Sequence, residues 1–211
     1  MRILEKVERR LGEKLFLKGD RCVSQKCAFS RRSYPPGIHG KKGKKGGGRK
    51  RGLSEMGKLL QEKQKVRFLY GLDDKNLERY YKDSIRKPGI FIINFLKLLE
   101  GRLDNVVLRM GLAESRHRAR QFISHGHILV NGRKLNIPSY QVKIGDTIAI
   151  KEKSLSLPIF ADLETKLKKH EIPSWLQLDP VKKTGKIVVR PETETFQSIF
   201  DVSKIKEFYS R

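Results

Sequence analysis

The sequence predicts an α+β fold: a mainly helical domain with an inserted small helix-plus-hairpin module and an irregular basic N-terminal arm. Apolar residues recur at helical spacing between Leu59 and Tyr70, which indicates helix. An Asn-Gly pair at 131–132 separates two short runs of strand-forming residues, which indicates a hairpin. The expected parts are the arm over 1–52, the helical domain over 53–100 plus about 191–211, and the inserted domain over 101–190, with its module at about 102–165.

The charge of the chain indicates a polyanionic partner. Of 211 residues, 47 are Lys or Arg and 23 are Asp or Glu, giving a formal net charge of +24. A protein this basic usually binds nucleic acid, with an anionic membrane as the second candidate. The excess lies in two regions: 1–52 holds 17 basic and 4 acidic residues, and 101–153 holds 10 and 4. Two separate basic regions favour a protein that binds a target of defined shape at two places.

Nothing in the chain predicts export or membrane insertion. The first 14 residues scatter charges among the apolar ones, unlike a signal peptide. The most apolar run, 90–96, is far shorter than the roughly 20 residues that cross a bilayer. Two cysteines are too few for a disulfide framework. We therefore expect a cytosolic protein with no membrane partner.

The arm carries the densest positive charge. The segment 31–51 has nine basic residues and no acid, so we expect it to stay mobile until phosphate orders it. A solvated linker has the same composition, and that alternative stays open. Prolines 35 and 36 with Gly37 predict a rigid, irregular loop. The candidate RNA contacts of the arm are Arg31, Arg32, Tyr34, His39, Lys41, Lys42, Lys44, Lys45, Arg49, Lys50 and Arg51.

Three helices are expected in the helical domain. Ser54 can cap the first, which runs to Tyr70 and ends at Gly71. The others are expected over 75–86 and from 92 to 100 or beyond. Further candidates for phosphate contact, expected to face away from the apolar stripe of the first helix, are Lys63, Lys65 and Arg67.

The module is expected to place a basic helix beside a hairpin. A further helical turn or two is expected over 103–110, and Ser115 can cap a helix that carries arginines at 116, 118 and 120. Strands are expected on both sides of the 131–132 turn and over 147–150. A solvated helix face is the usual interpretation of such charges, but no acid lies between Glu114 and Asp146, which favours phosphate contact. The candidates are Arg116, Arg118, Arg120, Arg133 and Lys134.

The remainder of the chain is expected to complete the core. Leu157-Pro158 opens a predicted helix that runs to His170, and a strand is expected over 186–190. A final amphipathic helix is expected to present its apolar stripe to the helical domain; the stripe is Ile199, Val202, Ile205 and Phe208.

The sequence contains no recognised catalytic motif. It has no Walker loop, no G-x-S-x-G and no H-E-x-x-H. Cys22 and Cys27 are spaced like one half of a zinc site, but a structural zinc needs about four ligands. Two interpretations stay open: a pair of small buried residues, or a metal site completed by Glu5, Glu8 or His39.

Segments spread along the chain share the pattern of one protein family. They are Leu15 to Cys22, Arg31 to Gly40, Leu60 to Arg67 with Tyr70-Gly71, Arg102 to Val107, Pro173 to Leu176 and Tyr209 to Arg211. Together they resemble the bacterial small-subunit ribosomal protein S four family almost from end to end. The segment Ser115 to Ser139, with Gly126 to Gly132 inside it, resembles the RNA-binding module named after that family.

The resemblance implies a non-enzymatic constituent of the small ribosomal subunit, located in cytoplasmic ribosomes. It implies early binding to the five-prime domain of 16S rRNA, nucleation of subunit assembly, and a place along the channel where mRNA enters. Implied partners are 16S rRNA, mRNA, ribosomal protein S five and other small-subunit proteins. The family also influences decoding accuracy, and some members repress their own operon.

Two other classes of function are compatible with a basic chain that carries this module. An RNA-modifying enzyme can use the same module to hold its substrate, but it needs a catalytic domain, and the remaining helices carry no recognised motif. A membrane-binding protein needs an amphipathic helix with lysines along its polar face and bulky aromatics opposite, and the sequence predicts no such helix.

The chain departs from the family pattern at the zinc site. Family members with zinc carry a Cys-x-x-Cys pair where this chain has Glu5 and Glu8, so only the second half of the four-cysteine site is present. Zinc is therefore a doubtful cofactor, with Cys22 and Cys27 as weak candidate ligands. Gln61 and Phe68 also stand where arginines are common.

Overall fold

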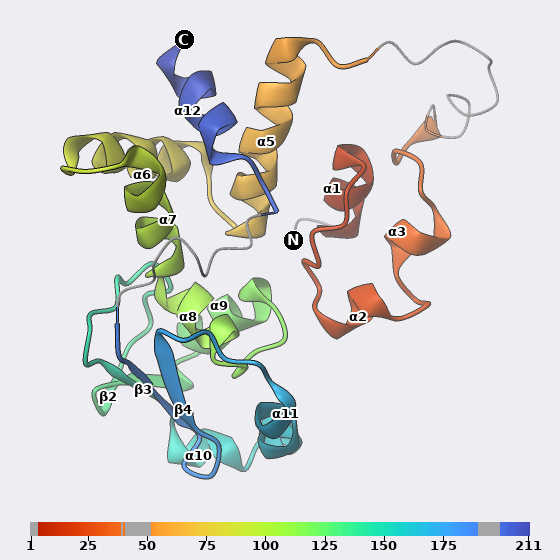
Figure 1. Cartoon of the computed structure of the whole chain (residues 1–211). Helices are drawn as coiled ribbons and strands as arrows, with labels where there is room; N and C mark the ends of the chain where they lie inside the picture. The colour runs from red at the N-terminus through yellow and green to blue at the C-terminus, as the bar shows by residue number, and fades with distance from the viewer. Residues whose placement is uncertain (1–3, 39, 41–51, 190–198) are drawn as a thin grey trace. The chain divides into compact units, whose positions relative to one another are not determined.

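The computed structural model describes residues 4–38, 40, 52–189 and 199–211, which belong to two compact units. The first comprises Met1–Tyr81 with Ser198–Arg211, and the second comprises Lys82–Gln197. Figure 1 shows the course of the chain. The mixture of helices with one antiparallel sheet confirms the predicted α+β class. Within the described ranges, no helix is long and apolar enough to cross a membrane.

The first unit is helical. Its elements are α1 (Leu4–Leu11), α2 (Asp20–Val23), α3 (Ala28–Arg31), α5 (Glu55–Leu69), the first part of α6 (Asp74–Arg86), and α12 (Val202–Ser210). The expectation of an irregular arm missed α1 to α3. Two of these helices have only four residues, too short for a periodic apolar pattern to identify them.

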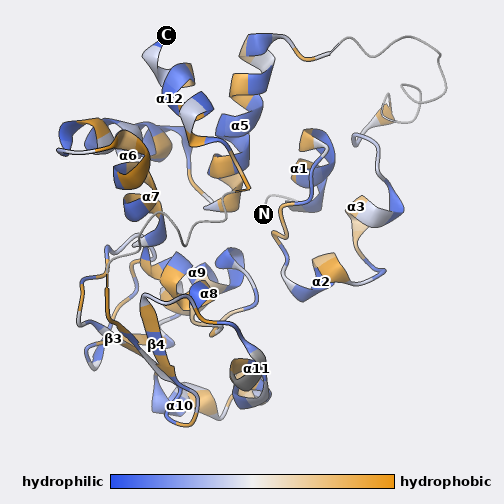
Figure 2. Cartoon of the chain, in the orientation of Figure 1, coloured by the Kyte–Doolittle hydropathy of each residue, from blue (hydrophilic) through white to orange (hydrophobic). Residues whose placement is uncertain are grey.

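The cap predicted for the first long helix is confirmed. The Ser54 hydroxyl accepts a hydrogen bond from the backbone N–H of Gly57 at 3.2 Å. The helix stops beside Gly71, whose φ of 61° lies in the left-handed region that glycine tolerates. Both orange and blue residues lie on α5 in Figure 2, and its buried side includes the charged residues Glu62 and Lys65 beside Leu59, Val66 and Leu69.

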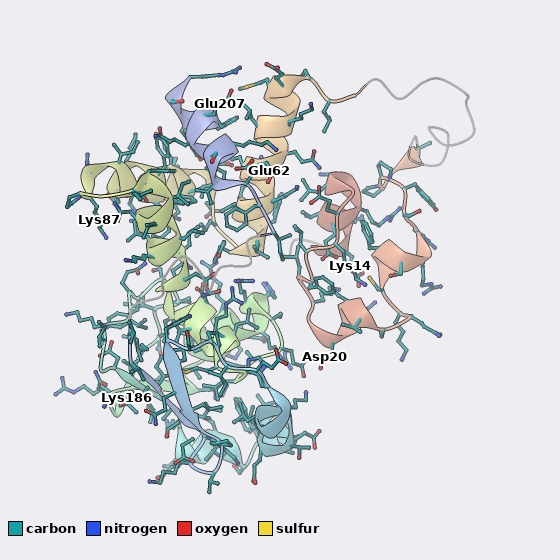
Figure 3. The ribbon with its side chains drawn as sticks, in the orientation of Figure 1. Lys14, Asp20, Glu62, Lys87, Lys186 and Glu207 are labelled. Carbon is teal, nitrogen blue, oxygen red and sulfur yellow. The ribbon has the colours of Figure 1, made fainter. Side chains whose placement is uncertain are left out.

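A buried carboxylate joins α5 to the C-terminal helix. Glu62 Oε2 accepts a hydrogen bond from the backbone N–H of Asp201 at 3.0 Å, and its Oε1 accepts one from Lys65 Nζ at 2.7 Å. Figure 3 labels Glu62 on α5 and Glu207 on α12, which lies beside it. Helix α12 packs on α5, whereas Ile199, expected in its apolar stripe, precedes the helix and is 48% exposed.

Tyr209 makes this helix contact sensitive to alkaline pH. Its ring stacks on Tyr81 with 4.8 Å between centroids, and its hydroxyl is buried without a hydrogen-bond partner among the described residues. Burial, followed by the charges of Asp74 and Glu78, raises the pKa of Tyr209 to about 12.

The first prediction follows from that pKa. Because the folded-state pKa exceeds the ordinary value of about 10, the contribution to stability is complete below pH ~10 and is lost as the pH rises toward about 12. We expect Tyr209→Phe to be neutral or stabilising at pH 8 and to lose less stability than the parent above pH 10. Urea unfolding at both pH values measures this. Equal pH dependence in the two proteins would contradict it.

The second unit combines helices with a five-stranded antiparallel sheet in the order β2-β1-β3-β5-β4. Its helices are the end of α6, α7 (Phe91–Glu100), α8 (Leu103–Arg109), α9 (Arg116–Ser124), α10 (Glu152–Leu155), the 3-10 helix Pro158–Phe160 and α11 (Leu163–Lys169). Its strands are β1 (Ile128–Val130), β2 (Arg133–Lys134), β3 (Thr147–Ile150), β4 (Leu176–Asp179) and β5 (Thr184–Ile187).

The Asn-Gly hairpin forms as predicted. Asn131 and Gly132 have φ values of 50° and 76°, as the tight turn between paired antiparallel strands requires. The Asn131 amide also joins this turn to β3, because it donates to Asp146 Oδ1 at 2.8 Å and accepts from the Thr147 N–H at 2.9 Å. Ile148 and Ile150 point inward, confirming the predicted alternation of β3.

The C-terminal part of the second unit differs from the expectation. The helix predicted from Pro158 to His170 is divided into the 3-10 helix and α11, and β4 was not predicted. Strand β5 begins at Thr184 rather than at residue 186, because it pairs with both β3 and β4. Gly185 fits there because a Cβ would lie 2.6 Å from Met110 Sδ, a contact that sequence periodicity does not reveal.

The domain boundaries remain a prediction. Helix α7 lies in the compact unit 82–197, whereas the helical domain predicted over 53–100 includes it.

Candidate nucleic-acid interface

Helix α9 presents basic side chains on one side because its apolar residues pack into the core on the other. The Ser115 hydroxyl accepts from the Arg118 N–H at 3.3 Å, which confirms the predicted cap. Ala119, Phe122 and Ile123 are buried, while Arg118 and Arg120 are exposed. The helix is therefore fixed by packing on one side and available to a ligand on the other.

Arg118 is held along the surface of this helix. Its Nη1 donates to Gln121 Oε1 at 3.0 Å, and its guanidinium carbon lies 5.4 Å from the centre of the Phe122 ring. The arginine is thus partly ordered before any ligand binds, which lowers the entropy cost of a phosphate contact.

The hairpin adds two exposed cations close to the end of α9. Arg133 and Lys134 form β2 and are both exposed. The Lys134 side chain lies against Gly126, where an added Cβ would overlap its Cε. We call Arg118, Arg120, Arg133 and Lys134 the exposed basic set. Packed elements carry all four, so their charges are presented in a defined geometry.

Arg116 is placed differently from the exposed basic set. Only 17% of its side chain is exposed. Its Nε donates to Asn105 Oδ1 at 2.8 Å, and its Nη2 lies 3.8 Å from Glu100 Oε1. Arg116 is therefore tied to the interior of the module, a role that the arginine pattern alone did not reveal.

The three candidates on α5 are engaged in ion pairs. Lys65 is 6% exposed and contacts Glu13 Oε2 and Glu62 Oε1, each at 2.7 Å. The expectation that it faces away from the buried side of α5 is wrong. Residues 63, 65 and 67 point in different directions around a helix, so they cannot all face away from its buried side. A Glu three residues before Lys65 is the sequence signal for an ion pair within the helix.

Lys63 and Arg67 share one acidic partner. Their nitrogens lie 3.1 and 2.9 Å from the carboxylate oxygens of Asp74, and Lys63 Nζ lies 4.7 Å from the centre of the Phe208 ring. These contacts hold helices of the first unit together. Phosphate contact by Lys63, Lys65 and Arg67 remains a prediction.

Arg9 organises the loop that follows α3, a role absent from the sequence analysis. Its Nε donates to the carbonyl oxygens of Arg32 and Tyr34 at 2.9 and 3.0 Å, and its guanidinium lies 5.0 Å from the Tyr34 ring centre. Arg31 and Arg32 are exposed beside it. The other arm candidates fall outside the described residues; they are His39, Lys41, Lys42, Lys44, Lys45, Arg49, Lys50 and Arg51.

The second prediction concerns this loop. In Arg9→Gln, the carbonyl oxygens of Arg32 and Tyr34 lose a charged hydrogen-bond donor. This loss should cost about 1.5 kcal/mol of local stability, so the rate of amide hydrogen exchange over residues 31–34 should rise roughly tenfold. Mass-spectrometric exchange measures this. Arg10→Gln is the control, because Arg10 is exposed and loses the same charge. Equal exchange in both variants would show that Arg9 does not hold the loop.

Glu5 and Glu8, which stand where zinc-binding family members carry cysteines, contact groups of the protein. Glu8 is fully buried, and its Oε1 accepts hydrogen bonds from the backbone N–H groups of Leu15 and Leu17, both at 3.1 Å. Glu5 Oε1 lies 2.9 Å from Arg21 Nε. In the described part of the chain, no group of three or more His, Cys, Asp or Glu residues could hold a metal ion. Glu8 therefore holds the backbone through hydrogen bonds, and Glu5 forms an ion pair with the side chain of Arg21.

The two thiols are buried and free. Burial is the main cause that raises the pKa of Cys22. For Cys27, burial acts in the same direction, but hydrogen bonds from the Ser30 and Phe29 backbone oppose it and lower the pKa overall. Both side chains are almost fully buried, which favours the interpretation of the pair as small buried residues.

Two family models together match most of the chain. The model described as "Ribosomal protein S4/S9 N-terminal domain" matches residues 4–100, and the model described as "S4 domain" matches residues 101–148. The second match contains all of the exposed basic set and also Arg116.

Curated relatives match almost the full length. Proteins named "Small ribosomal subunit protein uS4" from Syntrophomonas wolfei subsp. wolfei, Halothermothrix orenii and Caldicellulosiruptor saccharolyticus are 46%, 48% and 47% identical over 203 residues. Each alignment covers 96% of this chain and 94% of the relative.

Proposed function

The chain belongs to the uS4 family of small ribosomal subunit proteins, and from that membership we propose that it binds the five-prime domain of 16S rRNA early and nucleates subunit assembly. Proteins of this family are structural and non-enzymatic, which answers the rival interpretation of an RNA-modifying enzyme. The observation that carries the proposal is the exposed basic set, held on α9 and β2 of a packed module.

The proposed mechanism is recognition of RNA shape. Folded RNA presents phosphates and 2′-hydroxyls across its grooves and junctions, where side chains read geometry more than sequence. Four cations on packed elements can meet phosphates only when the RNA brings those phosphates into the matching arrangement. Arg31, Arg32 and Tyr34, on the loop that Arg9 holds, would supply a second contact region. The protein would then stabilise one arrangement of several RNA helices.

Further roles are part of the same proposal. The chain would line the channel where mRNA enters, contact ribosomal protein S five and other small-subunit proteins, and influence decoding accuracy in cytoplasmic ribosomes. The net charge of +24 supports contact with RNA beyond the primary site. Crosslinking of mRNA to the arm in isolated subunits tests the channel position.

Omission from a reconstitution tests the assembly role. Small subunits would be rebuilt from 16S rRNA and purified proteins with or without this chain, and the particles analysed by sedimentation and mass spectrometry. We expect omission to reduce the incorporation of later proteins, and late addition of the chain to rescue it poorly. Complete particles that lack only this protein would contradict nucleation.

A further inference from the structure

A buried carboxylate in the second unit holds two arginines. Glu100, the last residue of α7, is 2% exposed. Its two oxygens accept hydrogen bonds from Arg109 Nε and Nη2 at 3.0 and 3.2 Å, and Arg116 Nη2 lies 3.8 Å from Oε1. These arginines come from the last residue of α8 and the first residue of α9.

Asn105 links the same groups a second time. Its Nδ2 donates to Glu100 Oε2 at 2.7 Å, and its Oδ1 accepts from Arg116 Nε at 2.8 Å. Asn105 is fully buried, so its amide cannot exchange these partners for water without opening the module. The paired contact of Arg109 fixes the plane of its guanidinium, since a carboxylate matches the arginine fork in one orientation.

The cluster retains positive charge at the surface. Two guanidinium groups face one carboxylate, and 35% of the Arg109 side chain and 17% of the Arg116 side chain are exposed. A pair of oriented, partly exposed guanidinium groups is suited to a phosphate.

We propose that Glu100 is a positioning residue for RNA binding, and that it holds Arg109 and Arg116 as a preorganised pair for an RNA phosphate. The inference rests on the proposed function and adds Arg109 to the RNA-binding residues. Glu100 itself does not touch the RNA; it acts through the two arginines. Without it, both side chains would have to be ordered at the moment of binding, at a cost in affinity.

A positioning role for Glu100 and simple electrostatics predict opposite changes in RNA affinity when the Glu100 charge is removed. Removing a negative charge from a protein of net charge +24 should strengthen binding to any RNA. If Glu100 positions the arginines, Glu100→Gln should instead weaken binding to the specific RNA. Glu114→Gln is the matched control, because Glu114 lies in the same compact unit as Glu100, is half exposed, and forms a surface ion pair with Lys166 at 2.6 Å.

The experiment is a titration of each full-length protein against a transcript of the 16S five-prime domain and against an unrelated structured RNA of equal length. For Glu100→Gln we expect at least tenfold weaker binding to the five-prime domain and a salt slope lower by about 1 to 2, the loss of one or two phosphate contacts. For Glu114→Gln we expect unchanged or tighter binding.

The controls separate positioning from misfolding and from failure of the proposed function. A partly unfolded variant lowers the active fraction in a stoichiometric titration but leaves the salt slope of the remaining fraction unchanged. In the background of Arg109→Ala with Arg116→Ala, the further change Glu100→Gln should no longer weaken binding. If the parent prefers the five-prime domain and Glu100→Gln keeps its affinity and slope, the positioning role is wrong. If the parent itself shows no preference, the proposed function is wrong.

Discussion

Replacing the exposed basic set with glutamine should weaken binding to the 16S five-prime domain by about 100-fold or more at physiological salt. Each phosphate contact contributes on the order of 0.7 kcal/mol through counterion release, and four contacts are lost together. The salt slope should fall by about 3 for the same reason. Filter binding or fluorescence anisotropy at several salt concentrations measures both quantities. The variant carries Arg118→Gln, Arg120→Gln, Arg133→Gln and Lys134→Gln.

A matched variant removes equal charge elsewhere. Lys58, Lys75, Arg86 and Lys87 are all exposed and lie between residues 53 and 100, where basic and acidic residues are nearly balanced. Their replacement with glutamine should change affinity by only a few-fold. Equal losses in the two variants would mean that net charge alone drives binding and that the module has no special role.

Arg102→Ala should destabilise the second unit by about 3–5 kcal/mol, the largest stability effect we expect from a single substitution. Arg102 and Asp104 are each 2% exposed, and their side chains form a paired contact at 3.0 and 2.6 Å. Truncating the arginine leaves a buried carboxylate without its partner. Urea unfolding monitored by circular dichroism measures the loss.

The surrounding backbone explains why this pair matters for the fold. The N–H groups of Leu103 and Asp104 donate to the carbonyls of Tyr140 and Pro138 at 2.9 and 3.1 Å, so the start of α8 holds the segment that leads to β3. The double variant Arg102→Met with Asp104→Leu should recover most of the stability, because it removes both charges. A double variant as unstable as Arg102→Ala would show that the charges themselves are required.

Most of the fold that the sequence predicts follows from residues close together in the chain. Serines 54 and 115 were identified as caps because a cap depends on residues three positions away. The Asn131-Gly132 turn was identified because both residues tolerate the positive φ that the turn needs. Strand β4 and the early start of β5 depend instead on pairing and on the contact of Gly185 with Met110, which only the folded chain reveals.

At the candidate site too, features that depend on nearby residues were predictable and contacts between distant residues were not. Exposure of Arg118 and Arg120 follows from the burial of their neighbours at helical spacing, which the sequence displays. Lys65 has one partner nearby in sequence, Glu62, but its second partner Glu13 is distant. Glu100, the partner of Arg116, is distant too, so a count of basic residues could not identify these ion pairs. Arg9 and Arg109 were missed for that reason too, because each acts through a contact outside its own helix.

The salt-dependent preference of the full chain for the 16S five-prime domain tests the central claim most directly. The purified protein would be titrated against that transcript and against an equally long unrelated structured RNA, at several salt concentrations. Recognition of RNA shape predicts a preference of roughly 10³ or more that persists at physiological salt, by analogy with specific DNA binders. Equal affinities for both RNAs that fall together with salt would contradict it, since the charge of +24 would then account for all of the binding.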